Sequence, residues 1–250
     1  MDVAKLNELG EDLMRLLRCR TYPVGINLFE KEKDIPEYYE KTEQEFAVCH
    51  IIGKARYHEK PVAATKDFSK ACAVGGVVLG FGKFADNWAD VNVGRFSERK
   101  EGVEKARKLI FPFEYGKYEA FGAAPLNIIK IVPDVIQIFA NPLQVMEMIY
   151  GNTFNGDDNI QLSTNGHGAS CYEALVSPIV TGNIRLAIAD MGDRRYGYAS
   201  DDELILGVPT NKFERLIDGL KKNMKTWNGL PIKYTFQEIP KSVKAVMKGK

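Results

Sequence analysis

The chain has 250 residues, with 34 lysines and arginines against 33 aspartates and glutamates. This length suffices for one large core or two joined lobes. An apolar fraction of 45% with 27% charged residues excludes disorder along the whole chain. The balanced charge lacks the basic excess that duplex nucleic acid or an anionic lipid surface favours. We therefore expect a globular protein that binds neither nucleic acid nor membrane.

The sequence also indicates a compartment. Lys130, Pro133, Asp134 and Asn141 interrupt the longest apolar stretches, so none approaches the roughly 20 residues of a membrane span. The first residues lack the basic start and apolar centre of a signal peptide. Four cysteines are too few for a disulfide scaffold. These features predict a cytoplasmic protein in which each cysteine is a core residue, a metal ligand or a reactive thiol.

Helical and strand-like spacings alternate along the first half of the chain. The predicted elements are an amphipathic helix that ends near Cys19, a strand over 24–28, a helix over 46–56, a short strand over 61–66 and a charged surface helix over 98–110.

In the second half, residues 127–139 form two β-rich runs around Pro133 and Asp134, which predicts a hairpin. A helix begins at Asn141 and Pro142 and ends at Tyr150. The later predicted elements are a polar loop over 151–159, a strand over 184–188 and a helix over 213–220.

The alternation predicts the fold class and the domain organisation. Strands and helices interleave without a linker, a low-complexity tract or a repeat. We expect one mixed α/β unit over residues 1–250, with a mixed sheet that contains at least one antiparallel hairpin and is flanked by helices. A division into two lobes would fall near residues 151–159.

Three cysteines, Cys49, Cys72 and Cys171, lie in different segments but share small neighbours. Gly75 and Gly76 follow Cys72, and glycine is unfavourable inside a helix, so this pair indicates tight packing or close approach of the backbone. Thiolates bind soft metals and iron-sulfur clusters. Three thiolates would leave one position of a [4Fe-4S] cluster or a zinc ion open to a substrate.

The spacing of the cysteines alone does not decide their role. No pair forms a C-x2-C motif, and buried cysteine commonly acts as a small apolar residue. Inert packing therefore stays an alternative for each of them, and it is our interpretation of Cys19.

Two further positions could carry chemistry. His167 lies between Gly166 and Gly168, four residues before Cys171, which makes it a candidate catalytic residue or ligand; an ordinary surface histidine is the alternative. Arg194 and Arg195 follow a predicted strand, where a guanidinium group could hold an anionic ligand or form a surface ion pair. Neither nucleotide-loop spacing nor a common hydrolase motif is present.

Several blocks in order resemble one known family. They are PVGINLF, CHIIGKAR, KACAVGGVVLGFG, AAPLNIIKIVPDVIQIFANPLQVMEMIYG, HGASCYEALVSPIVTG and GDRRYGYASDDELILGVP, and together they resemble domain of unknown function family 169 over residues 10–222. That family is widespread in archaea and anaerobic bacteria and has no established reaction. The resemblance implies that Cys49, Cys72 and Cys171 are its recurring thiols. It also implies that its arginine before an acidic stretch corresponds to Arg195 or Arg194.

Together these features predict a cytoplasmic iron-sulfur protein that acts on a small molecule. Cys49, Cys72 and Cys171 are its expected ligands, with Gly75 and Gly76 beside the cluster. An open iron would meet a small substrate or an electron donor near His167 and Arg195. Zinc in place of the cluster, a non-catalytic small-molecule or metal-binding module, and thiol chemistry at Cys72 are the alternatives. The oligomeric state stays open, a homo-oligomer included.

Overall fold

An eight-stranded mixed sheet forms the centre of the protein. The computed structural model describes residues 1–225 except 70, 71, 73, 157, 158, 163 and 165. The sheet has the strand order β2-β3-β4-β1-β5-β8-β7-β6. Most neighbouring strands are antiparallel, while β2 with β3 and β6 with β7 are parallel. The predicted mixed α/β fold is confirmed.

Most of the predicted elements are present with shifted ends. The strands are β1 (Val24–Phe29), β2 (Glu40–Lys41), β3 (Val62–Thr65), β4 (Ala120–Pro125), β5 (Val135–Ala140), β6 (Gln161–Leu162), β7 (Arg185–Ile188) and β8 (Leu204–Pro209). The α-helices are α1 (Val3–Leu17), α2 (Val48–His58), α3 (Lys66–Ser69), α4 (Gly75–Val78), α5 (Trp88–Val91), α6 (Lys100–Lys108), α7 (Pro142–Phe154), α8 (Ser177–Thr181), α9 (Met191–Arg195) and α10 (Thr210–Met224). A 3-10 helix, η1 (Glu32–Asp34), and a π-helix, η2 (Ala169–Val176), complete them.

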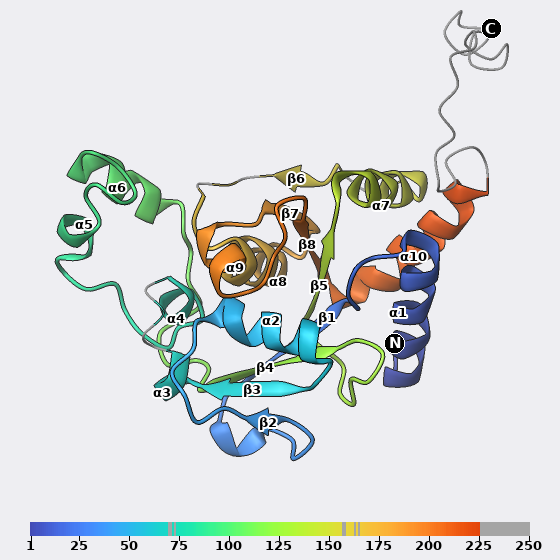
Figure 1. The fold of residues 1–250 in the computed structure, drawn as a ribbon, viewed down its shortest axis with the longest axis horizontal. Helices are drawn as coiled ribbons and strands as arrows, with labels where there is room; N and C mark the ends of the chain where they lie inside the picture. Colours follow the sequence, from blue (N-terminus) through green and yellow to red (C-terminus); the bar gives the residue numbers. More distant parts are fainter. Residues whose placement is uncertain (70–71, 73, 157–158, 163, 165, 226–250) are drawn as a thin grey trace, which may run out of the picture.

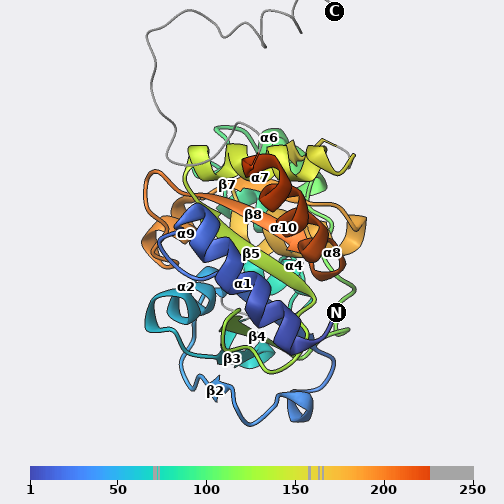
Figure 2. The same ribbon diagram turned by 90° about the vertical axis from the view of Figure 1, so that its right-hand side faces the viewer.

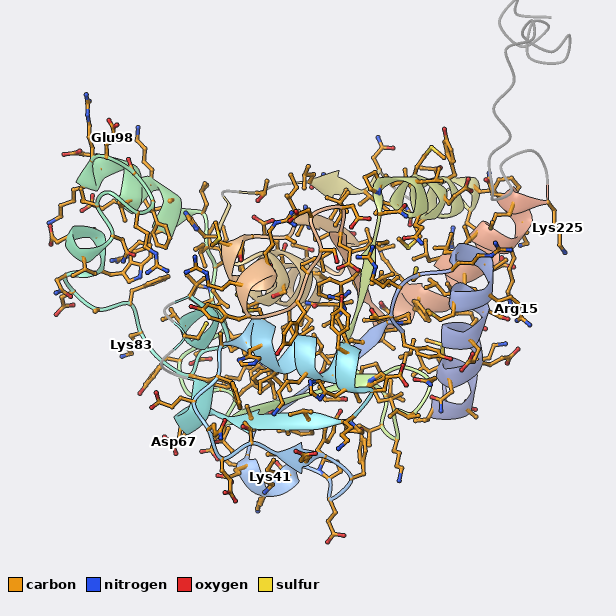
Figure 3. All side chains as sticks on the ribbon, viewed as in Figure 1. Arg15, Lys41, Asp67, Lys83, Glu98 and Lys225 are labelled. Carbon is orange, nitrogen blue, oxygen red and sulfur yellow. The ribbon has the colours of Figure 1, made fainter. Side chains whose placement is uncertain are left out.

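The sheet separates two cores. Along β5, Val135 and Phe139 belong to the core under α2 and η2, while Ile136 and Ile138 belong to the core under α1, α7 and α10. This alternation follows from the two-residue period of a strand. Figure 1 and Figure 2 show α1 and α10 on one side of the sheet and α2 and α9 on the other. Side chains fill both layers (Figure 3).

A segment with its own small core projects from this body. It carries α5 and α6, and Trp88, Ala89 and Val103 are buried together between them. Figure 1 shows the two helices standing away from the sheet, and Glu98 and Lys83 mark the segment in Figure 3. Its apolar contacts are thus largely independent of the main cores.

The hairpin predicted at 127–139 is wrong in its position. β4 and β5 are not neighbours, because β1 lies between them and pairs antiparallel with both. The first β-rich run is a connection in which Ile129 is buried while Ile128 and Val132 are exposed. Pro125 ends β4 before this run, and a strand from the distant N-terminal part takes the central place. Antiparallel pairing of consecutive strands occurs instead between β7 and β8.

Helix α7 extends four residues beyond its predicted end at Tyr150. Gly151 permits this, because a methyl group there would lie 2.8 Å from the backbone nitrogen of Leu220 on α10. The helix thus occupies the start of the predicted loop over 151–159, and residues 157 and 158 of that loop lie outside the described residues. Within the described part of the chain, no helix combines the length and the apolar character needed to cross a membrane.

We predict that Gly207→Ala destabilises the protein by about 1–3 kcal/mol, because a methyl group there would collide with the carbonyl oxygen of Ala174 on η2. Urea unfolding measures the loss. Gly82→Ala is the matched control, since a methyl group at Gly82 meets nothing within 4 Å. Equal unfolding free energies of the two variants would contradict close packing of η2 on β8.

Candidate functional site

The three candidate cysteines come from three segments on the same side of the sheet. Cys49 is the second residue of α2, and Cys171 is the third residue of η2. Cys72 precedes α4, and its carbonyl oxygen accepts a hydrogen bond from the backbone nitrogen of Gly76, 3.0 Å away. Cys171 is buried, whereas Cys49 and Cys72 are half-buried.

Glycines allow these segments to meet. A methyl group at Gly75 would lie 2.8 Å from Sγ of Cys72 and 2.7 Å from Cγ2 of Val48, the residue before Cys49. One at Gly168 would lie 3.6 Å from Sγ of Cys171 and 3.2 Å from Cγ1 of Val74. The predicted role of Gly75 in close approach is therefore visible in its contacts.

A third glycine, Gly192 on α9, lies next to the side chain of Cys49. A methyl group at Gly192 would lie 3.6 Å from Sγ of Cys49 and 3.2 Å from Oδ1 of Asp190. Each of the three thiols thus lies beside a glycine where two segments meet, and Cys49 also lies beside the first turn of α9.

Burial and nearby negative charge favour the protonated thiols of Cys49 and Cys171, because both raise the pKa values of these two groups. Burial raises the pKa of Cys171 well above its ordinary value, and negative charge on Cys72, Asp190, Asp193 and Cys49 raises this pKa further. The pKa of Cys49 is raised chiefly by burial, then by Asp193, Cys72 and Asp190. The pKa values of Cys49 and Cys171 therefore depend on the charges of neighbouring side chains, as expected of groups that lie close together.

The side chain of Asp190 forms hydrogen bonds with both α9 and the start of η2. It is the N-cap of α9, and its Oδ1 accepts hydrogen bonds from the backbone nitrogens of Gly192 and Asp193 at 2.7 and 3.0 Å. Its Oδ2 accepts from Gly168 and Ala169, at the start of η2, at 2.5 and 3.1 Å. A single carboxylate therefore caps two helical segments and holds the loop of Cys171 against α9.

Asp193 adds a second, deeper connection. Its carboxylate accepts hydrogen bonds from the hydroxyl and the backbone nitrogen of Ser170. The carbonyl oxygen of Ser170 accepts one from Nε2 of Gln137 on β5, at 2.6 Å. Burial raises the pKa of Asp193 to about 7, and the nearby charge of Asp190 contributes to this rise.

His167 lies beside the pocket and contacts the projecting segment. Its ring centre is 3.7 Å from that of Phe96. Burial and Arg95 lower the pKa of His167, while Asp190 opposes the shift. His167 is thus within electrostatic reach of the carboxylate that holds the Cys171 loop.

The two candidate arginines differ in their surroundings. Arg194 donates a hydrogen bond from Nη1 to the carbonyl oxygen of Ser200, 2.7 Å away, and forms an ion pair with Asp201. Arg195 is exposed and has no hydrogen-bond or ion-pair partner within the described residues. It is the last residue of α9, so it lies at the end opposite to Asp190. The structure therefore does not bring Arg195 into the cluster of thiols and carboxylates.

Cys19 lies apart from this group. It is buried in the core on the other side of the sheet, and its pKa is raised to about 12, chiefly by burial. This placement agrees with its interpretation as a packing residue.

The sequence analysis missed Asp190 and Ser170, although Asp190 and Asp193 have the spacing of a capping box before a short helix. Among the residues that the structure describes, no three His, Cys, Asp or Glu side chains are placed to hold a metal ion. In its described conformation the site is a partly buried cluster of three cysteines with the carboxylates of Asp190 and Asp193 near Cys49 and Cys171.

The fold and the site define a mixed α/β protein with three cysteines on the side of the sheet that α2 and η2 cover. The chain belongs to the DUF169 family, described as Uncharacterised ArCR, whose model matches residues 12–219. It is 23% identical over 234 residues to the uncharacterised protein MJ0308 of Methanocaldococcus jannaschii, covering 91% of this chain and 98% of that protein. No solved structure matches the chain.

We predict that Asp193→Asn removes part of the pH dependence of stability. Because the folded-state pKa of Asp193 is above its ordinary value of 3.8, the wild-type free energy of unfolding falls as the pH rises from about 4 to about 7. An asparagine imitates the protonated acid, since its oxygen can accept from the backbone while its amide donates to Ser170. Urea unfolding between pH 4 and pH 8 measures the difference.

The control is Asp201→Asn, which changes a fully exposed carboxylate next to Arg194. It should follow the wild-type pH profile. Parallel profiles for wild type and Asp193→Asn would contradict the elevated pKa of Asp193.

Proposed function

We propose that the protein is an iron-sulfur protein in which Cys49, Cys72 and Cys171 ligate a [4Fe-4S] cluster and leave one iron open to a small molecule. The observation that supports the proposal is that Cys171 lies within electrostatic reach of both Cys49 and Cys72, although the three residues come from separate segments. When bound, the cluster would supply one-electron transfer and a Lewis-acidic iron. The small molecule would be a substrate or an electron donor.

The negative groups around Cys49 and Cys171 support binding of a positively charged metal centre. Negative charge on Cys72, Asp190 and Asp193 raises the pKa values of both Cys49 and Cys171, and Cys49 also raises that of Cys171. Without a guest, deprotonating more than one thiol places like charges together in a buried site, which raises their pKa values. A metal centre reverses this preference, because each ligand binds as a thiolate and releases its proton.

Binding of a cluster would require the cysteine side chains to move. Cluster ligation needs sulfur separations of roughly 6–7 Å, a wider spacing than the roughly 4 Å set by four zinc-sulfur bonds of about 2.3 Å. The described side chains are not placed to hold a metal ion. In this proposal the thiols therefore turn toward the guest, while Asp190 keeps the backbones of the Cys171 loop and α9 together.

The rim of the pocket suggests where the small molecule would bind. His167 is next to Gly168 and near Asp190, so it could donate a proton or a hydrogen bond to a molecule on the open iron. Arg195, exposed and without a described partner, would attract an anionic molecule from solution rather than contact the cluster. His167 is therefore the catalytic residue of the proposal, and Arg195, which was predicted as a second one, has the role of attracting the small molecule.

We predict that protein purified without air contains about four irons and four sulfides per chain and absorbs in the visible. Cys49→Ser, Cys72→Ser and Cys171→Ser should each lose most of the iron, because a serine hydroxyl replaces a thiolate ligand. Cys19→Ser is the matched control and should keep the full iron content. Iron, sulfide and zinc analyses of all five proteins provide the readout.

Several outcomes would contradict the proposal. One is the lack of iron after anaerobic reconstitution with ferrous salt and sulfide. Another is colourless protein in which stoichiometric zinc depends on the same three cysteines. Selective alkylation of Cys72 with no metal bound would favour thiol chemistry at that residue instead.

A further inference from the structure

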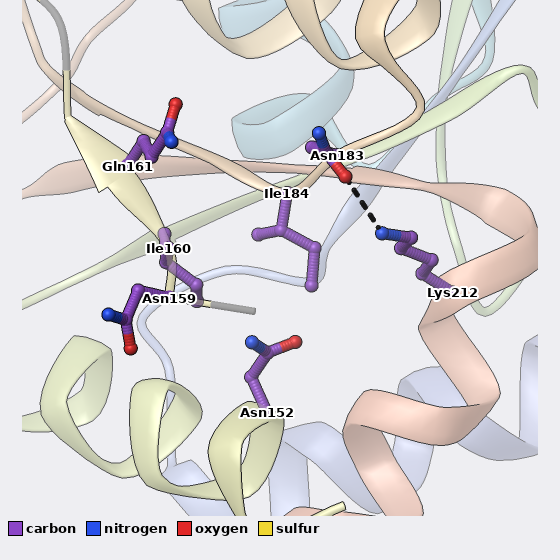
Figure 4. A pocket seen from close by; sticks show the side chains of 7 residues that line it. All are labelled: Asn152, Asn159, Ile160, Gln161, Asn183, Ile184 and Lys212. Carbon is purple, nitrogen blue, oxygen red and sulfur yellow. Dashed lines mark hydrogen bonds between the residues drawn. The ribbon is translucent and has the colours of Figure 1, made fainter. Parts of the chain in front are cut away.

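A second pocket lies on the other side of the sheet, between α7, α10 and the edge strands β6 and β7. Figure 4 shows it, with Asn152 from α7 and Lys212 from α10 facing the chain around Ile160 and Ile184. Ile184 belongs to the core opposite the thiols. The pocket is therefore separate from the cysteine site.

Its lining combines one cation with neutral hydrogen-bonding groups. Lys212 is half-buried, and its Nζ donates a hydrogen bond to Oδ1 of Asn183, 3.0 Å away. Three further carboxamides line the pocket, those of Asn152, Asn159 and Gln161. None of the described lining residues carries a carboxylate.

Other lysines of α10 are arranged differently. Lys221 forms an ion pair with Asp12, and Lys222 forms one with Asp218. Lys212 makes no ion pair within the described residues, and its partner is a neutral amide. An anion in the pocket could therefore bind the ammonium without displacing a protein carboxylate.

The floor determines the size and polarity of the ligand. Asn152 and Ile184 are buried there, and Ile160 adds a second apolar side chain. The pocket has a volume of about 270 Å³. This is below the roughly 300–1,000 Å³ of sites for drug-sized molecules, so it suits a ligand of a few carbon atoms.

We propose that this pocket binds a small aliphatic monocarboxylate. Its carboxylate binds Nζ of Lys212 and the amide of Asn183, and its short alkyl chain packs on Ile160 and Ile184. One ammonium matches one negative charge, whereas a phosphate dianion would leave one charge without a partner and would lose hydration of its oxygens against the isoleucines.

The experiment is a titration of the full chain with sodium butyrate at constant ionic strength, followed by NMR of the side-chain amides. We expect saturable shifts of the Asn183 and Asn152 amide signals. Butyrate should bind more tightly than acetate because it buries more apolar surface. Butyramide, which has the same chain without the charge, should bind at least tenfold more weakly.

Lys212→Met should weaken butyrate binding at least tenfold, and Lys212→Arg should restore part of it. Lys222→Met is the matched control on the same helix and should bind like the wild type. The proposal is overturned if butyrate produces no saturable shifts, if Lys212→Met binds as tightly as wild type, or if inorganic phosphate binds more tightly than butyrate. Circular dichroism confirms that each variant is folded.

Discussion

The carboxylate of Asp190 is the interaction on which the thiol pocket depends. It accepts four backbone hydrogen bonds, two from the first turn of α9 and two from the start of η2. Hydrogen bonds to a charged group contribute about 1.5–3 kcal/mol each, more than neutral ones. Asp193 of α9 adds a second connection to the same loop through the hydroxyl and backbone nitrogen of Ser170.

This arrangement has an electrostatic cost. Asp190 and Asp193 lie close to Cys49 and Cys171, so their charge opposes formation of these thiolates. The same negative field would stabilise the cationic centre of the proposed function. Under that proposal, Asp190 and Asp193 oppose the free thiolates but favour their binding to a metal.

The sequence predicted the helices and strands with strong periodicity, such as α1, α2, β1 and α10. The sequence did not predict that β1 is the neighbour of β5. The turn at Pro133 favoured the run just before it, but packing over many residues selects the distant strand β1 instead. Local pattern and tertiary pairing disagree there, and the tertiary pairing prevails.

The candidate site was predicted in part. The three cysteines and Gly75 were singled out, because thiols with small neighbours have a local signature. The sequence does not show what Asp190 and Asp193 bind, since their partners on η2 lie about 20 residues earlier in the chain. The pocket at Lys212 combines four segments and has no sequence motif.

The most direct test of the account is a crystal structure of anaerobically prepared protein with anomalous data at the iron absorption edge. The account predicts one strong iron peak bounded by Sγ of Cys49, Cys72 and Cys171, with these sulfurs roughly 6–7 Å apart. Iron at another place, or the three sulfurs packed against one another in iron-reconstituted crystals, would contradict it.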